Sequence, residues 1–187
     1  MRLRRAFLVA PMLLPLGACG SASATPAATA SVSSSPVAVP RPTALPADAY
    51  PVMAALQGHL AGKWTNTTYS TNGTMAWDVS ADSSARTVTI VVTITGNAFG
   101  MPAPAPERIE LTHLAQGRIG GPSMAFGTVN GTITSTGHLQ MTLTQLPVAM
   151  ITKVDVSGML TATSVTLNYT VTFSGGGTAT GTVTMSK

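Results

Sequence analysis

Charged residues, aromatic residues and cysteines are all scarce in this chain of 187 residues. Only 9% of the residues are charged and 5% are aromatic, whereas about a quarter of an ordinary soluble domain is charged. The low charge argues against disorder caused by charge repulsion over most of the chain. The chain has a single cysteine, Cys19, which excludes a disulfide within this sequence.

The net charge of +4 depends on three arginines close to the N-terminus, Arg2, Arg4 and Arg5. Without these three of the ten basic residues, seven remain against six acidic residues. No basic cluster is left that would attract a phosphate backbone. Nucleic acid is therefore not an expected partner.

The first 19 residues have the parts of a bacterial export signal. The three arginines precede an apolar run over 6–16, which is too short to span a membrane as a helix. Leu16-Gly17-Ala18-Cys19 follows, and it resembles the lipobox of bacterial lipoproteins. The resemblance implies that residues 1–18 are a signal peptide. It also implies that Cys19 is covalently lipidated and that palmitate is among the attached acyl groups. It implies export and anchoring to the cell membrane or outer membrane, with the folded domain outside the cytoplasm. The alternative is an ordinary signal peptide followed by a chance cysteine.

Residues 19–47 are rich in Ser, Ala, Thr, Pro and Val. Prolines recur along this segment, and no apolar periodicity is present. The composition predicts a disordered tether between the lipidated Cys19 and a folded domain over 48–187. Fully extended, such a tether would reach roughly 90–100 Å.

The folded domain is expected to be almost entirely β-structure after one short helix. The spacing of apolar residues predicts that helix over 51–60, ended by Gly62. Beyond Lys63, apolar residues alternate with polar ones, and most of the 29 threonines of the chain occupy the alternate positions. With the turn signals between them, these runs predict strands near 63–70, 74–80, 85–95, 108–114, 123–134, 138–145, 150–162, 165–173 and 178–186.

Each of these strands has one apolar face and one threonine face, and the connections are short. Neighbouring strands should therefore pair antiparallel and bury the apolar face. Closing the sheet on itself also removes its exposed edges. The sequence thus predicts an all-β, antiparallel up-and-down barrel of about eight strands, with a β-sandwich as the alternative.

Gly62-Lys63-Trp64, directly after the expected helix, resembles the Gly-x-Trp start of the calycins, the lipocalin and avidin barrels. The resemblance implies that Gly62 permits a sharp start of the first strand. It also implies that Trp64 is a structural plug under the N-terminal helical turn. In avidins an Asn two residues after this Trp, and a Ser four further on, bind the ligand. Asn66 and Ser70 occupy those positions and are candidate ligand-binding residues.

Three further candidates for ligand binding are apolar or aromatic. Phe99 and Met101 lie in a long loop over 96–106, where they would cover the barrel mouth or touch a partner. The alternative for Phe99 is a side chain tucked into the core. Tyr169 lies on the apolar face of the strand predicted over 165–173.

Neither a metal site nor a catalytic centre is expected. His59, His113 and His138 are far apart and lack metal-ligand spacing, and the methionines are scattered as core residues would be. No cofactor motif or nucleophile motif is present. An enzyme would require two or more of these histidines, Asp78 and Asp155 to converge in a pocket.

Two functions follow as hypotheses. The first is a lipid-anchored envelope protein whose barrel binds a small, mainly apolar ligand, because barrel mouths are common ligand sites. The second is a solid-core barrel that acts through its surface loops, as an envelope interaction or structural protein or as an inhibitor. A filled interior with an exposed Phe99–Met101 patch would favour the second hypothesis.

Overall fold

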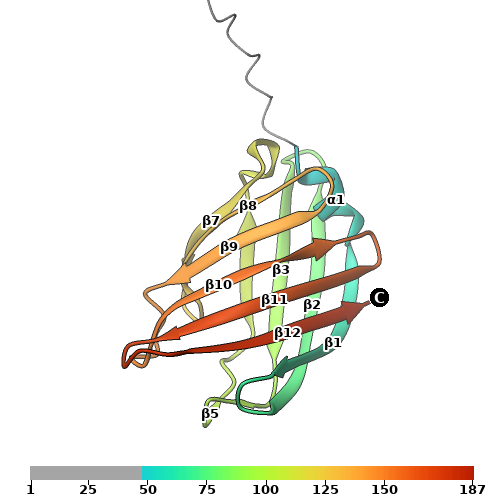
Figure 1. Cartoon of the computed structure of the whole chain (residues 1–187). Coiled ribbons are helices and arrows are strands. Elements are labelled where there is room, and N and C mark those ends of the chain that lie inside the picture. Colours follow the sequence, from blue (N-terminus) through green and yellow to red (C-terminus); the bar gives the residue numbers. More distant parts are fainter. Residues whose placement is uncertain (1–47) are drawn as a thin grey trace, which may run out of the picture. The chain divides into compact units, whose positions relative to one another are not determined.

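One antiparallel sheet of ten strands curves around an apolar interior (Figure 1). The computed structural model describes residues 48–187, so the expected signal peptide 1–18, Cys19 and the tether 19–47 lie outside the described residues. The elements in chain order are α1 (Tyr50–Ala55), β1 (Gly58–Asn66), β2 (Thr71–Asp82), β3 (Thr87–Ile94), β4 (Asn97–Ala98), β5 (Met101–Pro102), β6 (Glu107–Leu111), the 3-10 helix η1 (Leu114–Gln116), β7 (Arg118–Ser123), β8 (Gly127–Ile133), β9 (His138–Thr144), β10 (Ile151–Leu160), β11 (Ser164–Phe173) and β12 (Thr178–Ser186).

The strand order confirms the predicted up-and-down barrel. The sheet runs β6-β3-β2-β1-β12-β11-β10-β9-β8-β7, so the first strand pairs with the last and the barrel is nearly closed. It has ten strands where about eight were predicted. The strand expected over 123–134 corresponds to β8, and the additional strand β7, which was not predicted, pairs with it as a hairpin. Pro122 is tolerated within β7 because this strand lies at the edge of the sheet.

The helix is shorter than the 51–60 predicted from apolar spacing. Pro51 is suited to the first turn of α1, and the helix ends at Ala55. Gly58 has a φ of +119°, a conformation that suits glycine, and it begins β1 by pairing with Val79. Residues 58–60 therefore pair with β2 as the start of β1 and do not continue the helix.

The register places apolar side chains inside and threonines outside. Leu60, Trp77 and Leu167 are buried in the interior. On the outer face, threonines of β11 lie directly opposite threonines of β12, as in the pairs Thr166–Thr184 and Thr170–Thr180. Such β-branched pairs suit a sheet with one solvated face.

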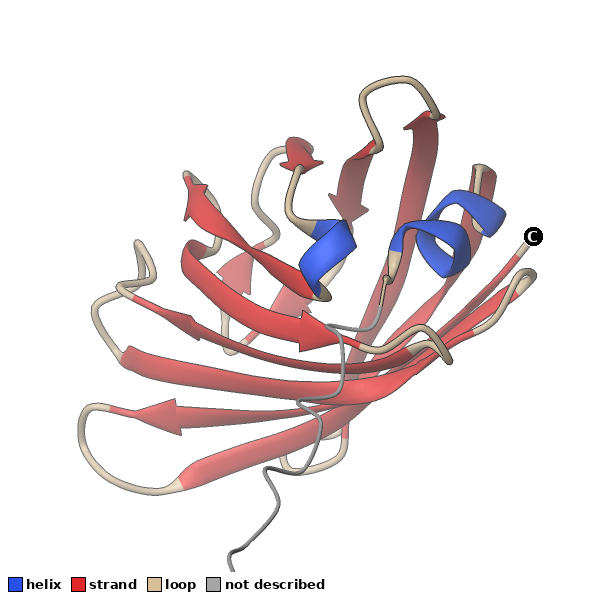
Figure 2. Cartoon of the chain, turned by 90° about the horizontal axis from the view of Figure 1, so that it is seen from above, coloured by secondary structure: helices blue, strands red, loops and turns tan. Residues whose placement is uncertain are grey.

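Helices cover one end of the barrel, which we call the α1 end (Figure 2). Met53, Leu56 and Leu114 are buried there, and the backbone amide of Ala49 donates to the Leu114 carbonyl at 2.9 Å. This hydrogen bond ties the start of α1 to η1. The α1 end is therefore sealed by apolar side chains.

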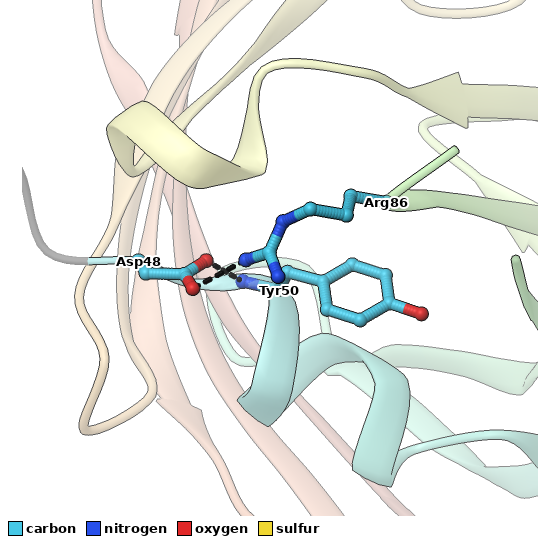
Figure 3. Close-up of polar contacts among 3 residues, drawn as sticks. All are labelled: Asp48, Tyr50 and Arg86. Atoms are coloured by element: carbon cyan, nitrogen blue, oxygen red, sulfur yellow. Dashed lines mark hydrogen bonds and ion pairs between the residues drawn. The ribbon is translucent and has the colours of Figure 1, made fainter. Parts of the chain in front are cut away.

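A polar clamp holds α1 from outside (Figure 3). The Arg86 guanidinium pairs with the Asp48 carboxylate and lies 4.9 Å from the centre of the Tyr50 ring. The Tyr50 backbone amide donates to Asp48 Oδ1 at 3.0 Å. The hydrogen bond from Arg86, followed by that from Tyr50, lowers the pKa of Asp48.

The opposite end of the barrel, which we call the mouth end, is built only from connections between strands. They are the turns 67–70, 124–126 and 174–177, the loop 145–150 and the segment 95–106, which contains the small β4–β5 hairpin. The two edge strands, β6 and β7, do not pair with each other. They border a seam that runs from η1 to the mouth end.

Candidate ligand-binding cavity

A cavity of about 860 Å³ occupies the barrel interior. This volume lies in the upper part of the ~300–1,000 Å³ range of ligand pockets. Its walls come from the inner faces of most strands of the sheet and are largely aliphatic or aromatic. The wall residues include Trp64, Trp77, Ile90, Val92, Ile109, Ile119, Val129, Leu139, Met141, Leu143, Val156 and Leu167.

The cavity reaches the surface at the mouth end. Its lining there includes Pro104 and Pro106, which are exposed, and Met124, whose exposed fraction is 91%. At the α1 end the lining ends on the buried residues Met53 and Leu160. The barrel is therefore a hollow container that is sealed at one end and accessible at the other.

Glu107 links the edge strands β6 and β7 at the mouth end of the seam. Its carboxylate accepts three hydrogen bonds from the end of β7 and the turn after it: from Ser123 Oγ at 2.8 Å and from the backbone amides of Met124 at 2.8 Å and Ala125 at 2.9 Å. Partial burial alone would raise the pKa of Glu107, but these hydrogen bonds outweigh it and lower the pKa below its ordinary value of 4.5. One ionised side chain thus joins the first residue of β6 to the end of β7.

Replacing Glu107 by glutamine (E107Q) is expected to lower the free energy of unfolding by about 2 kcal/mol at neutral pH, because a charged acceptor of three hydrogen bonds is lost. The folded pKa lies below the ordinary 4.5, so this contribution is complete above that pH and disappears as the pH falls through the folded value. The difference between wild type and E107Q should therefore shrink in acid. Denaturant unfolding across this pH range measures it. E110Q is the control, since Glu110 is exposed on the same strand. Equal stability of the two variants would show that the hydrogen bonds of Glu107 do not stabilise the barrel.

Three of the five predicted ligand-binding residues line the cavity: Phe99, Met101 and Tyr169. Phe99 does not project as a free lid. It is half-buried and packs edge-on against Tyr69 and Phe173, with ring centres 5.9 and 5.4 Å away. The long loop is therefore folded against the mouth end rather than extended into solvent.

Tyr169 crosses a gap in the wall left by a glycine. A Cβ at Gly181 would lie 2.3 Å from the Tyr169 hydroxyl, so the ring passes over this position. The hydroxyl then donates to the Thr65 carbonyl at 3.1 Å. Burial raises the pKa of Tyr169, which keeps the phenol neutral and its proton engaged with β1.

The remaining two candidates, Asn66 and Ser70, do not line the cavity. Asn66 is fully buried, and its Oδ1 accepts the backbone amide of Tyr69 at 3.0 Å, which holds the turn after β1. Its Nδ2 has no hydrogen-bond partner among residues 48–187. Ser70 is exposed in the same turn with a φ of +54°. The structure thus gives Asn66 and Ser70 places in a turn beside the mouth.

Trp64 is buried, but it lies at the mouth end rather than under α1. Strand β1 runs away from the helix before it reaches this residue, so the location implied by the calycin resemblance is corrected. The indole packs where Gly73 and Gly96 lack side chains, and a Cβ at Gly73 would lie 2.4 Å from Nε1. The indole N–H donates to the Thr95 carbonyl at 2.8 Å. Trp64 therefore anchors the start of the segment 95–106 to the barrel wall.

Gly62 lies in β1, opposite Met185 of β12. A Cβ at this position would lie 1.8 Å from the Thr184 carbonyl oxygen and 2.6 Å from Met185 Cα. Both atoms belong to the backbone and cannot rotate away. Gly62 therefore permits the tight pairing of the first and last strands.

Sequence reasoning missed Glu107 and Trp77 as parts of the cavity. The hydrogen-bond partners of Glu107 lie sixteen to eighteen residues away along the chain. No local pattern marks such a contact. Trp77 does follow the alternation of its strand. Its position on the apolar face of that strand was the signal that could have predicted it in the cavity wall.

The residues considered for catalysis do not form a pocket. His59 Nδ1 and Asp78 Oδ1 lie 2.7 Å apart, but both side chains are about three-fifths exposed, at 62% and 60%. The Asp155 carboxylate instead pairs with Lys153 Nζ at 2.7 Å. Within the described part of the chain, no group of three His, Cys, Asp or Glu residues is placed to hold a metal ion.

Searches against family models and curated proteins found no match. Among solved structures, Rv2717c from M. tuberculosis aligns over 75% of this chain and 98% of its own, with 14% identity and a TM-score of 0.55. EF1p2_mFAP2b, whose structure was determined bound to DFHBI, aligns over 74% of this chain and 98% of its own, with 14% identity and a TM-score of 0.44. At this level of identity, the likeness to Rv2717c establishes a barrel fold and identifies no family.

Residues 48–187 contain no helix with both the length and the hydropathy needed to cross a membrane.

Proposed function

We propose that this protein is a lipid-anchored envelope lipoprotein whose barrel binds a small, mainly apolar ligand and acts by binding rather than by catalysis. The observation that carries the proposal is the apolar cavity of about 860 Å³, accessible at the mouth end. An empty space of this size, lined by aliphatic and aromatic side chains, would gain dispersion contacts and bury apolar surface when filled.

The same observation weighs against a solid-core barrel that acts through its loops. That alternative needs a filled interior and an exposed Phe99–Met101 patch. The interior is hollow, and both Phe99 and Met101 are partly buried against it. The anchoring part of the proposal rests on Leu16-Gly17-Ala18-Cys19 and on the apolar run before it.

Tryptophan fluorescence gives a direct test, because both tryptophans of the chain, Trp64 and Trp77, line the cavity. A dibrominated octadecanol that enters the cavity would place bromine against both indoles. We expect it to quench most of the tryptophan emission with saturable dose dependence.

Unbrominated octadecanol is the first control and should not quench. The single variants W64F and W77F should each retain quenching, since either remaining indole faces the same cavity. Emission that is unchanged by the brominated alcohol, in a protein shown to be folded by circular dichroism, would contradict ligand binding in the barrel.

A further inference from the structure

The walls of the cavity offer no group that would hold a charged ligand. Among the described residues that line it, none is basic and the only acidic one is Glu107. The polar groups of the other wall residues are already used or covered. The Trp64 indole donates to Thr95 and the Tyr169 hydroxyl donates to Thr65, while Trp77 Nε1 is buried and has no hydrogen-bond partner among residues 48–187.

The connections that form the mouth end carry no positive charge, and of the two basic residues just beyond them, Arg108 lies on β6 and Lys153 on β10, where it pairs with Asp155. The turns 67–70, 124–126 and 174–177, the loop 145–150 and the segment 95–106 contain no Lys, Arg or His. The three large apolar side chains that are most exposed in the described residues all lie in these connections: Tyr69 at 53%, Met124 at 91% and Met150 at 45%. A ligand therefore meets a rim that has exposed apolar side chains and whose connections carry no positive charge.

Glu107 is the one charged side chain in the cavity lining, and it repels anions. Its carboxylate is occupied by Ser123, Met124 and Ala125, so it has little remaining capacity to accept a hydrogen bond from a ligand. A carboxylate or phosphate head group would lose solvation at this rim without a cation to replace it, and it would face a like charge.

Resting on the proposed function, we infer that the cavity selects uncharged lipids, such as long-chain alcohols, esters or isoprenoid-like hydrocarbons, and discriminates against lipids with an anionic head group. The discrimination arises at the mouth, where the head group of a buried chain would lie. The hydrocarbon chain itself would occupy the same walls in both cases.

Oleyl alcohol and oleate test this inference, because they share a chain and differ only in the head group. Each competes with dibrominated octadecanol for the purified full chain in a non-ionic detergent at low ionic strength, and recovery of tryptophan emission measures displacement. Oleate is expected to bind at least about tenfold more weakly than oleyl alcohol. Equal affinities, or tighter binding of oleate, would overturn charge selection while leaving cavity binding intact. Failure of the brominated alcohol itself to quench would instead overturn the proposed function.

A charge added at the mouth provides the matched variant. M124K places a cation on the most exposed rim residue and should raise the ratio of oleate affinity to oleyl alcohol affinity several-fold, because the added charge acts on the anionic head group. S83K adds the same charge to an exposed turn at the α1 end and should change neither affinity. If M124K leaves the ratio of the two affinities at the wild-type value, the head group does not lie at this mouth and the inference fails.

Discussion

Replacing Cys19 by alanine (C19A) is expected to abolish lipid attachment. Cells fed an alkyne analogue of palmitate should label the wild-type protein and leave C19A unlabelled. The physical reason is that the thiol is the acyl acceptor that the lipobox resemblance implies, and the chain has no second cysteine. Two or three acyl chains, at ~0.8 kcal/mol per buried CH₂ group, make an anchor stable, so the loss is all-or-none.

The mass of the purified protein provides the second readout for this variant. The wild-type chain should begin at Cys19 with the acyl mass attached, and C19A should retain residues 1–18. S23A, a change in the tether that leaves the lipobox intact, is the control and should be labelled and processed normally. Wild-type labelling of C19A would contradict anchoring through this residue.

Replacing Gly62 by alanine (G62A) is expected to lower the free energy of unfolding by about 3 kcal/mol, at the upper end of what overpacking typically costs. The added Cβ would lie 1.8 Å from the backbone oxygen of Thr184, and only a movement of β12 or β1 relieves that contact. Because β1 and β12 are neighbours in the middle of the sheet, the strain falls on the pairing that joins the first and last strands. Thermal unfolding should show a fall in Tm of about 9 °C.

G175A is the matched control for G62A. Gly175 lies in the β11–β12 turn, and a Cβ there would have no neighbouring atom within 4 Å. Its φ also lies outside the left-handed region that favours glycine. G175A should therefore unfold within about 0.5 kcal/mol of wild type, the usual range for surface substitutions. A G62A protein as stable as G175A would show that the two strands have room to separate.

Much of the barrel was predictable because period-two alternation is a local signal. Strands β3, β9, β11 and β12 lie close to their predicted ranges, since each carries a run of alternating apolar and polar residues, which only Val91 of β3 interrupts. The wall residues follow from the same alternation. Once a strand is placed, its apolar face gives the cavity lining, as Leu139 and Leu167 illustrate.

The features that shape the mouth were not predictable in this way. The hydrogen bonds between Glu107 and the end of the β7 strand depend on how β6 and β7 approach each other across the seam, which no local pattern specifies. Helix α1 was extended too far because the apolar spacing continues into residues that pair with β2 instead. Strand β7 was missed because Gly120, Gly121 and Pro122 indicate a break, whereas an edge strand accommodates them.

The cavity volume likewise lies beyond the sequence. Alternation gives the identity of inward-facing residues, but the space between opposite walls depends on the number of strands and on their tilt. A barrel of ten strands encloses more space than the eight predicted, and the inward side chains of this chain leave about 860 Å³ unfilled. The choice between a hollow and a solid interior therefore required the structure.

Native mass spectrometry of the protein isolated from its own envelope tests the central claim most directly. The account predicts a non-covalent adduct that denaturation removes, with the mass of an uncharged lipid, in addition to the acyl mass that remains on Cys19. A bare protein mass that persists after incubation with a lipid extract from the same envelope would contradict ligand binding in the barrel.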